Sequence, residues 1–272
     1  MKGRRSRFLF SMLCFGLAFL YIPIILMMIY SFNHSRLVPV WGGFSTRWYK
    51  VLFESEEVWA ATALSLKIAV LNATFAVMLG TLAGLALARI SRFRGRTLFT
   101  GMISAPLVMP EVITGLSLLL LFITLNQTMG WPANRGITTI TIAHITFSMA
   151  YVAVIIQSRL AGTGLDLEEA ALDLGARPFR VLWDITLPQL VPGMVAGWLL
   201  AFTLSLDDLV IASFVSGPGA TTLPMLIYSR IRLGLRPDIN ALATIMIMVV
   251  TIGVLIAAWV MLRQQRASKE LQ

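Results

Sequence analysis

The stretch from Phe8 to Phe32, FLFSMLCFGLAFLYIPIILMMIYSF, decides the class of fold because none of its side chains is charged. A helix needs about 20 consecutive, mostly apolar residues to cross a bilayer. Further charge-free stretches of comparable length follow at 68–88, 112–134, 137–158, 185–206 and 240–262. We therefore predict an all-α polytopic membrane protein. Its six transmembrane helices are expected near residues 8–32, 62–88, 98–125, 137–158, 190–215 and 239–262.

The overall composition excludes an ordinary soluble domain. Of the 272 residues, 57% are hydrophobic and only 13% are charged, whereas soluble proteins carry about 25% charged residues. The net charge of +9 comes from Lys and Arg at the ends of apolar stretches, where they orient spans in the bilayer. We therefore expect lipid, and no nucleic acid, around the chain. Cys14 is the single cysteine and the two histidines are far apart, so no metal site is predicted.

The distribution of charges predicts how the chain is organised. More Lys and Arg fall on the side that holds both termini if there are six spans, so we expect both termini in the cytoplasm. Residues 1–272 then form a single transmembrane domain. The stretch from Ile185 to Ser229 is long enough for two spans, but Ser216-Gly-Pro-Gly219 and Pro224 interrupt it. We interpret it as one span followed by a loop or re-entrant segment.

The longest predicted cytoplasmic loop, residues 159–188, contains a short helix signature. Asp166 and Glu169 have the spacing of a capping box. Gly175 suits the residue just after a helix end, because glycine readily adopts a left-handed conformation. The pattern predicts a short helix through Leu174.

The composition of this short helix indicates a docking role. Ala170 and Ala171 leave its surface shallow, and Asp173 lies four residues before Arg177, with which it can form an ion pair. A short amphipathic helix with small residues fits into a groove of another protein.

The same loop resembles a known family signature. The pattern Glu169-Ala170-Ala171-x3-Gly175-x9-Ile185-x-Leu187-Pro188 is similar to the inner-loop signature of permease subunits of binding-protein-dependent ABC importers. The segments Ala105–Gly115 and Ser205–Gly219 resemble the polyamine branch of that family. Together with Trp41, Thr46-Arg-Trp-Tyr49 and Gly130-Trp-Pro132, they resemble its putrescine permeases in particular.

The resemblance implies a fold, a function and a set of partners. It implies the type I ABC importer permease fold in a bacterial inner membrane and a subunit that carries a polyamine, putrescine foremost, into the cytoplasm. The partners it implies are a second homologous permease in a heterodimer, two copies of a cytoplasmic ATPase and an extracytoplasmic polyamine-binding protein. The residues it implies for ATPase coupling are Glu169, Ala170, Ala171, Gly175 and Pro188.

The sequence lacks the G-x-x-x-x-G-K-[ST] pattern of a phosphate-binding loop. We therefore expect a transport subunit and not an enzyme. No cofactor is expected in this chain, and ATP and magnesium are expected on the partner ATPase.

Three acidic residues interrupt the apolar spans: Glu111, Asp207 and Asp208. A charge at a span's centre costs about 2.5–3.5 kcal/mol on insertion scales, so such residues usually face a cavity or a partner. Pro106 and Pro110 precede Glu111 and remove helical N–H donors. A broken helix, freed carbonyls and carboxylates can together replace the water lost by a diammonium substrate.

The two adjacent aspartates are expected to do different work. Thr203 and Asp207 share a helix face, while Asp208 points about 100° away. One aspartate can line the path while the other bonds to a neighbouring span or to backbone near Gly217. A structural anchor or an external gate contact is the alternative for each acid. His144 is interpreted as a hydrogen-bonding bridge between helices.

Two other functions remain open at this point. A proton-coupled secondary carrier for a cationic amine would use the same acids as proton sites, but it leaves the pattern of the 159–188 loop without a purpose. An intramembrane aspartyl protease would need facing aspartates on separate spans, where the third span offers Glu111. The choice among putrescine, spermidine and other amines rests on the resemblance alone.

Overall fold

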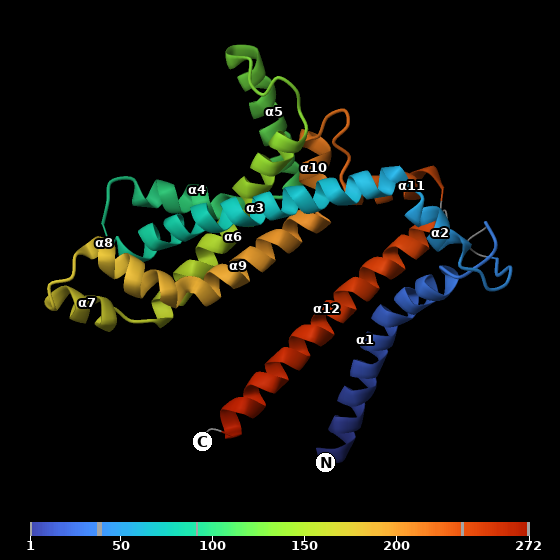
Figure 1. The fold of residues 1–272 in the computed structure, drawn as a ribbon, viewed down its shortest axis with the longest axis horizontal. Helices are drawn as coiled ribbons and strands as arrows, with labels where there is room; N and C mark the ends of the chain where they lie inside the picture. Colours follow the sequence, from blue (N-terminus) through green and yellow to red (C-terminus); the bar gives the residue numbers. More distant parts are fainter. Residues whose placement is uncertain (1, 37–39, 91, 235–236, 271–272) are drawn as a thin grey trace. The chain divides into compact units, whose positions relative to one another are not determined.

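The computed structural model describes residues 2–36, 40–90, 92–234 and 237–270. Apart from an isolated bridge between Asn33 and Phe44, the regular structure of these residues is helical (Figure 1). Internal contacts divide the chain into two compact units. Unit 1 comprises Met1–Trp59 and Ile227–Gln272, and unit 2 comprises Ala60–Leu226.

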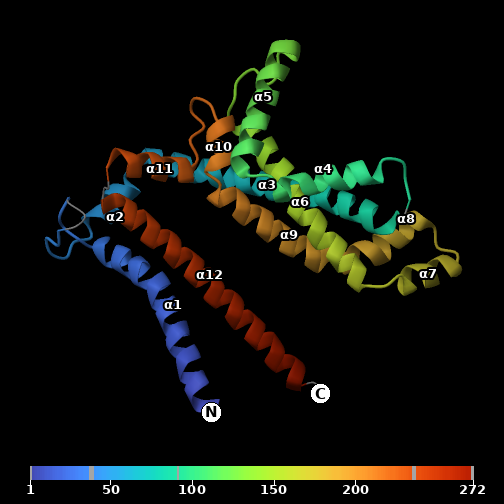
Figure 2. The ribbon, with the colours of Figure 1, turned by 180° about the vertical axis from the view of Figure 1, so that it is seen from behind.

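Unit 2 contains most of the predicted spans. Its helices are α3 (Glu56–Arg89, from residue 60), α4 (Arg96–Val108), α5 (Glu111–Met129), α6 (Ile137–Gly162), α7 (Asp166–Asp173), α8 (Pro178–Val181), the π-helical turn η1 (Leu182–Thr186), α9 (Leu187–Asp207), α10 (Val210–Val215) and the start of α11 (Leu223–Leu233). Helices α3, α6 and α9 run beside one another in the views from both sides (Figures 1 and 2).

Close packing of α3, α6 and α9 depends on glycine. A Cβ atom added to Gly80 of α3 would lie 2.6 Å from Cβ of Val152 on α6, and one added to Gly84 would lie 2.9 Å from Cβ of Ile156. A Cβ added to Gly197 of α9 would lie 3.2 Å from Cγ1 of the same Val152. Small residues allow helices to come this close in a membrane, as the spacing of the two α3 glycines predicts.

A second core joins α5, α6 and α10. Its buried residues include Phe122, Ile140, Ile211 and Val215. Gly115 of α5 lies against this core, because an added Cβ there would meet the ring of Phe214 at 2.7 Å. The short helix α10 is therefore held at the side of α5.

Unit 1 contains α1 (Lys2–Tyr30), α2 (Arg47–Phe53), most of α11 and α12 (Pro237–Glu270). Helices α1 and α12 are antiparallel neighbours, so the start of α1 and the end of α12 lie at the same end of this pair (Figure 1). The loop after α1 is organised by Asn33, whose side chain bonds to the backbone of Ser35, Val40 and Gly42.

Five helical segments are long and apolar enough to cross a membrane, and α12 has a shorter apolar stretch, Pro237–Gly253, within the described residues. Six spans therefore stay a prediction, as does their union in a single domain. Two predicted spans differ in detail from the structure. Residues 98–125 fall on two helices, α4 and α5, which are separated at Met109 and Pro110. Residues 190–215 fall on α9 and α10, with the helix interrupted at Asp208 and Leu209.

Candidate functional site: the α6–α9 loop and a buried polar cluster

The loop between α6 and α9 carries the short helix α7, which ends as the sequence predicts. Gly175 has φ +85°. Its N–H donates to the carbonyl of Leu172 at 2.9 Å, and the N–H of Ala176 donates to the carbonyl of Ala171 at 3.0 Å. This pair of bonds is the Schellman motif, which satisfies carbonyls left over at a helix end. Glycine at position 175 is therefore a requirement of the turn.

The start of α7 differs from the prediction. Leu165 is the N-cap residue and no side chain caps the helix, so the predicted capping box with Asp166 as its first residue is wrong. Asp166 instead lies in the first turn with Glu168 and Glu169, where negative charge is favourable beside the free N–H groups. Within the described residues, no ion pair joins Asp173 to Arg177, contrary to the expected pairing.

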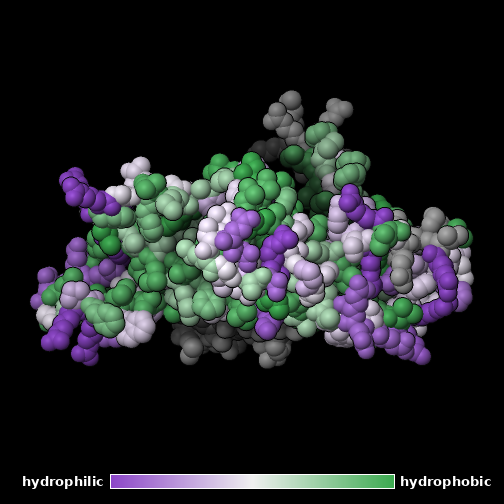
Figure 3. All heavy atoms as spheres, turned by 90° about the horizontal axis from the view of Figure 1, so that it is seen from above, coloured by the Kyte–Doolittle hydropathy of each residue, from purple (hydrophilic) through white to green (hydrophobic). Residues whose placement is uncertain are grey.

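One face of α7 is apolar and exposed. Leu167 is 64% exposed and Leu174 is 89% exposed, and their spacing of seven residues places them on one side, with Ala170 between them. Glu169 is exposed as well. Hydrophilic residues gather at the end of unit 2 that carries this loop, while mainly hydrophobic residues cover the helices beside it (Figure 3).

Two aromatic side chains extend the exposed apolar surface of the loop. Phe179 and Trp183 are 75% and 63% exposed, and their rings stack at 6.2 Å. Sequence reasoning concentrated on the alanines and missed both the leucines and these rings. The spacing of Leu167, Ala170 and Leu174 was the available signal.

The opposite face of α7 is attached to the membrane helices. The carboxylate of Glu168 lies 2.8 Å from a terminal nitrogen of Arg89, the last residue of α3. The hydroxyl of Thr186 donates to the same carboxylate at 3.0 Å. Pro188 is the second residue of α9, which continues without a break from the π-helical turn η1.

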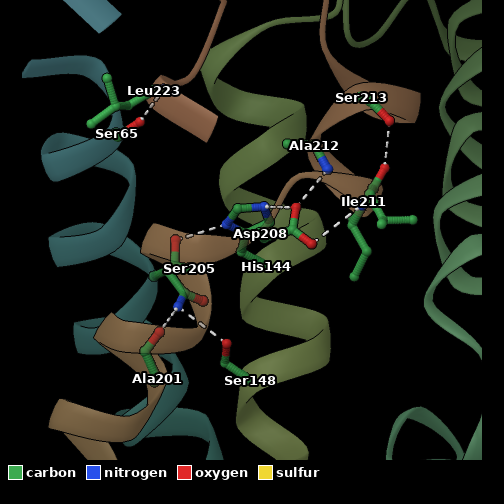
Figure 4. Close-up of polar contacts among 12 residues, drawn as sticks. Ser65, His144, Ser148, Ala201, Ser205, Asp208, Ile211, Ala212, Ser213 and Leu223 are labelled. Atoms are coloured by element: carbon green, nitrogen blue, oxygen red, sulfur yellow. Dashed lines mark hydrogen bonds and ion pairs between the residues drawn. The ribbon is translucent and has the colours of Figure 1, made fainter. Parts of the chain in front are cut away.

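A buried polar cluster occupies the other end of α9. We define it as Asn72, His144, Ser148, Ser205 and Asp208, of which Figure 4 labels the last four. Nε2 of His144 lies 3.1 Å from Oδ2 of Asp208, and Nδ1 lies 2.7 Å from the hydroxyl of Ser205. The side chains of His144 and Asp208 are only 3% and 9% exposed. His144 therefore bridges α6 to the end of α9, as predicted.

Asp208 has a second task at the break between α9 and α10. Its carboxylate accepts hydrogen bonds from the backbone N–H of Ala212 at 2.7 Å and of Ile211 at 3.3 Å. These donors belong to the first turn of α10, where N–H groups have no helical partners. Of the two alternatives expected for one of the aspartates, the bond to a neighbouring span is the one present. Its backbone partners are Ile211 and Ala212, and not residues near Gly217.

The remaining members of the polar cluster join α3 to α6 and α9. The amide nitrogen of Asn72 donates to the hydroxyl of Ser148 at 3.1 Å and to the carbonyl of Ala201 at 2.8 Å. Asn72 is fully buried. Hydrogen bonds of this kind hold transmembrane helices together.

Asp207 and Glu111 are exposed, in contrast to Asp208. Within the described residues, neither carboxylate has an ion-pair partner. Glu111 is the first residue of α5, directly after the break at Pro110. One turn later, Gly115 packs against α10, so the helix that carries Glu111 begins beside the short helix capped by Asp208. Each of the two exposed acids thus lies next to a broken helix.

The long apolar helices define a multi-pass membrane protein, and comparison with known proteins identifies its family. Residues 76–269 match the family described as "Binding-protein-dependent transport system inner membrane component". The chain belongs to this family of inner-membrane, multi-pass transport subunits.

Individual relatives in this family cover nearly the whole chain. It is 56% identical to the putrescine transport system permease protein PotI of Escherichia coli strain K12, over 96% of this chain and 93% of that protein. It is 42% identical to the spermidine/putrescine transport system permease protein PotC of the same strain, over 91% of each.

Solved structures share the fold. A chain of a bacterial ABC transporter involved in alginate import superposes with a TM-score of 0.72 at 15% identity, covering 95% of this chain and 97% of that one. A chain of the methionine ABC transporter MetNI gives a TM-score of 0.61 at 16% identity, covering 81% of this chain and 98% of that one. The predicted ABC importer permease fold is confirmed.

Proposed function

We propose that this chain is the membrane-spanning permease subunit of an ATP-driven importer that carries a polyamine, putrescine foremost, into the cytoplasm. The similarity to a putrescine permease over 96% of the chain carries the proposal. Membership of a binding-protein-dependent family decides against the proton-coupled carrier that the acids alone leave open.

The exposed acids suit a substrate with two ammonium groups. Asp207 is exposed at the end of α9, while Asp208 is engaged by His144 and by α10. Glu111 is exposed at the start of α5. Carboxylates and carbonyls at broken helices can replace the water that an ammonium group loses, so Asp207 and Glu111 are assigned to the substrate path and Asp208 to the support of Asp207.

Energy for transport comes from a partner. The chain has no phosphate-loop motif, so ATP and magnesium bind to a cytoplasmic ATPase, present in two copies. The exposed face of α7 with Leu167, Ala170 and Leu174 supports a docking role, since amphipathic helices bind grooves through such spacing. Glu169, Ala171, Gly175 and Pro188 complete the coupling set. A second homologous permease completes the pathway, and an extracytoplasmic binding protein delivers the polyamine.

Both termini are assigned to the cytoplasm. The start of α1 and the end of α12 lie at the same end of the α1/α12 pair (Figure 1). The sequence has four Lys and Arg residues between positions 2 and 7 and three between 263 and 269, and such residues favour the cytoplasmic side.

Uptake of radiolabelled putrescine tests the function directly. Cells without their own polyamine uptake receive the companion subunits with or without this chain. We expect putrescine to accumulate only when the chain is present. Unlabelled amines unrelated to putrescine should compete poorly with its uptake. Accumulation that persists without the ATPase, or that a protonophore abolishes at constant ATP, would contradict the proposal.

The partnership with the ATPase has a separate test. Leu174→Asp places a charge on the most exposed residue of the docking face, while the matched change Leu233→Asp alters an equally exposed leucine outside the loop. We expect Leu174→Asp to reduce copurification of the ATPase and Leu233→Asp to leave it unchanged. Equal copurification by both variants would remove α7 from the interface.

A further inference from the structure

Glu168, the acid immediately before the Glu169-Ala170-Ala171 pattern, is the side chain of α7 that reaches the transmembrane helices. Its carboxylate contacts Arg89 at 2.8 Å and accepts a hydrogen bond from Thr186 at 3.0 Å. Within the described residues, no other side chain of α7 forms a hydrogen bond or ion pair with α3 or with the start of α9. Three segments thus converge on one carboxylate.

The three partners are largely withdrawn from water. The side chains of Arg89 and Glu168 are 21% and 16% exposed, and Thr186 is 3% exposed. Nε of Arg89 is buried without a hydrogen-bond partner, and its terminal nitrogen also lies 3.4 Å from the carbonyl of Gly164. Screening by water and salt is weaker for such a pair than for a surface pair, so its geometry is held more firmly.

An apolar hollow surrounds the same contact. Leu172 lies on the Glu168 side of α7, and the hollow is lined by Leu82 and Leu85 of α3 and by Val181 and Leu182 beyond α7. This face of α7 is therefore turned toward α3 and η1, while Leu167 and Leu174 are turned outward.

Glycine turns connect both ends of α7 to the neighbouring helices. Gly164 precedes the helix and Gly175 follows it, both with positive φ. Glycine is the most permissive residue for such conformations, so each end of α7 is joined to the bundle through a glycine turn. In addition to these turns, Glu168 gives α7 a direct side-chain contact with α3 and with the turn that leads into α9.

Arg89 and Thr186 each lie at the end of a membrane helix, so the contact with Glu168 connects α7 to both helix ends. Arg89 is the last residue of α3, the helix that packs on α6 through Gly80 and Gly84. Thr186 ends the π-helical turn that continues into α9, and such turns occur often at functional positions. A pull on Glu168 therefore acts on the ends of two membrane helices together.

We propose that the Arg89–Glu168–Thr186 contact is the link that transmits movement of α7 to α3 and α9, with Glu168 as a positioning residue for coupling. The inference rests on the proposed function, in which α7 is the segment moved by the ATPase. Glu169 and the apolar face of α7 meet the partner, and Glu168 holds the helix to the permease.

The test compares transport with ATP hydrolysis in one preparation. The complete transporter is reconstituted in liposomes with either wild-type chain or Glu168→Gln, and putrescine uptake per ATP hydrolysed is measured. Coupling between sites typically changes affinity or population by 5- to 150-fold, so we expect this ratio to fall about tenfold. Hydrolysis and subunit composition should remain close to wild type.

Two further variants separate coupling from a general loss of charge. Asp184→Asn breaks the ion pair with Arg180 in the same loop. The side chains of Arg180 and Asp184 are 81% and 59% exposed, so the loss of this pair should leave the ratio of uptake to hydrolysis unchanged. The charge exchange Arg89→Glu with Glu168→Arg should recover part of it. If Glu168→Gln fails to assemble, Thr186→Val, which replaces the hydroxyl with a methyl group, is measured for the same ratio.

The outcomes distinguish this inference from the proposed function. A wild-type transporter that hydrolyses ATP but takes up no putrescine contradicts the proposed substrate. Uptake of radiolabelled spermidine per ATP hydrolysed then replaces putrescine uptake as the measure of coupling. A wild-type ratio in Glu168→Gln, or in Thr186→Val where that variant is used, overturns the inference. An equal loss in Asp184→Asn also overturns it.

Discussion

Nε2 of His144 lies 3.1 Å from Oδ2 of Asp208, in a contact that is almost fully withdrawn from solvent. It joins the first half of α6 to the point where the helix is interrupted between α9 and α10. Because Asp208 also caps α10, a single carboxylate fixes both the interruption and the helix that follows. Asp207, its exposed neighbour, is left available to a ligand.

Replacement of Asp208 by alanine is expected to destabilise the protein. Loss of a helix cap costs about 1 kcal/mol, and loss of a hydrogen bond between membrane helices costs about 0.6 kcal/mol on average. The midpoint of thermal unfolding in detergent should therefore fall. Asp207→Asn is the control, because the Asp207 carboxylate is exposed. A similar fall of the unfolding midpoint in both variants would contradict the assignment of a structural role to Asp208 alone.

Asp207→Asn is instead expected to impair uptake while the transporter assembles normally. A hydrogen bond to a charged group contributes about 1.5 kcal/mol or more, which corresponds to at least about a tenfold loss at low putrescine concentration. Initial rates of radiolabelled putrescine uptake measure this loss, and membrane abundance of each subunit serves as the control.

Glu111→Gln should reduce uptake in the same assay, because its carboxylate is also exposed beside a helix break. Wild-type rates in both the Asp207 and the Glu111 variants would remove these acids from the substrate path.

The two helix breaks differ in how far the sequence predicts them. The separation of α4 from α5 follows a local cause, since Pro110 lacks the N–H that would continue the helix. The separation of α9 from α10 has no proline or glycine at Asp208 or Leu209. This break coincides with the bonds from His144, Ile211 and Ala212 to Asp208. Because His144 lies 64 residues from Asp208 along the chain, this contact leaves no local sequence signal.

A similar contrast applies to α7. The glycine turn at its end was predictable because the left-handed position is a local property of Gly175. The functional division between adjacent acids was not, because Glu168 acquires its role from Arg89, 79 residues earlier. The family pattern drew attention to Glu169, which is exposed, and away from Glu168.

Helix packing at Gly80 yields a stability prediction with an internal control. Gly80→Ala would place a Cβ 2.6 Å from Cβ of Val152, whereas an added Cβ at Gly101, also within a helix, meets nothing within 4 Å. Overpacking costs about 1–3 kcal/mol, so Gly80→Ala should lower the unfolding midpoint. Gly101→Ala should leave it unchanged or raise it, because alanine favours helix.

Reversal of charge at Glu169 is expected to uncouple transport without disturbing the fold. The side chain is exposed, and within the described residues it forms no hydrogen bond or ion pair, so Glu169→Lys removes no internal contact. An unfavourable lysine at the proposed ATPase interface should slow uptake by about tenfold or more, since a like charge placed opposite a charged partner costs several kcal/mol. Comparison of putrescine uptake with basal ATP hydrolysis measures the effect.

Asp173→Lys, on the same helix, shows whether added positive charge alone is responsible. Undiminished uptake in Glu169→Lys would place the ATPase contact elsewhere on the loop, whereas loss of the chain from the membrane would mean that Glu169 supports folding.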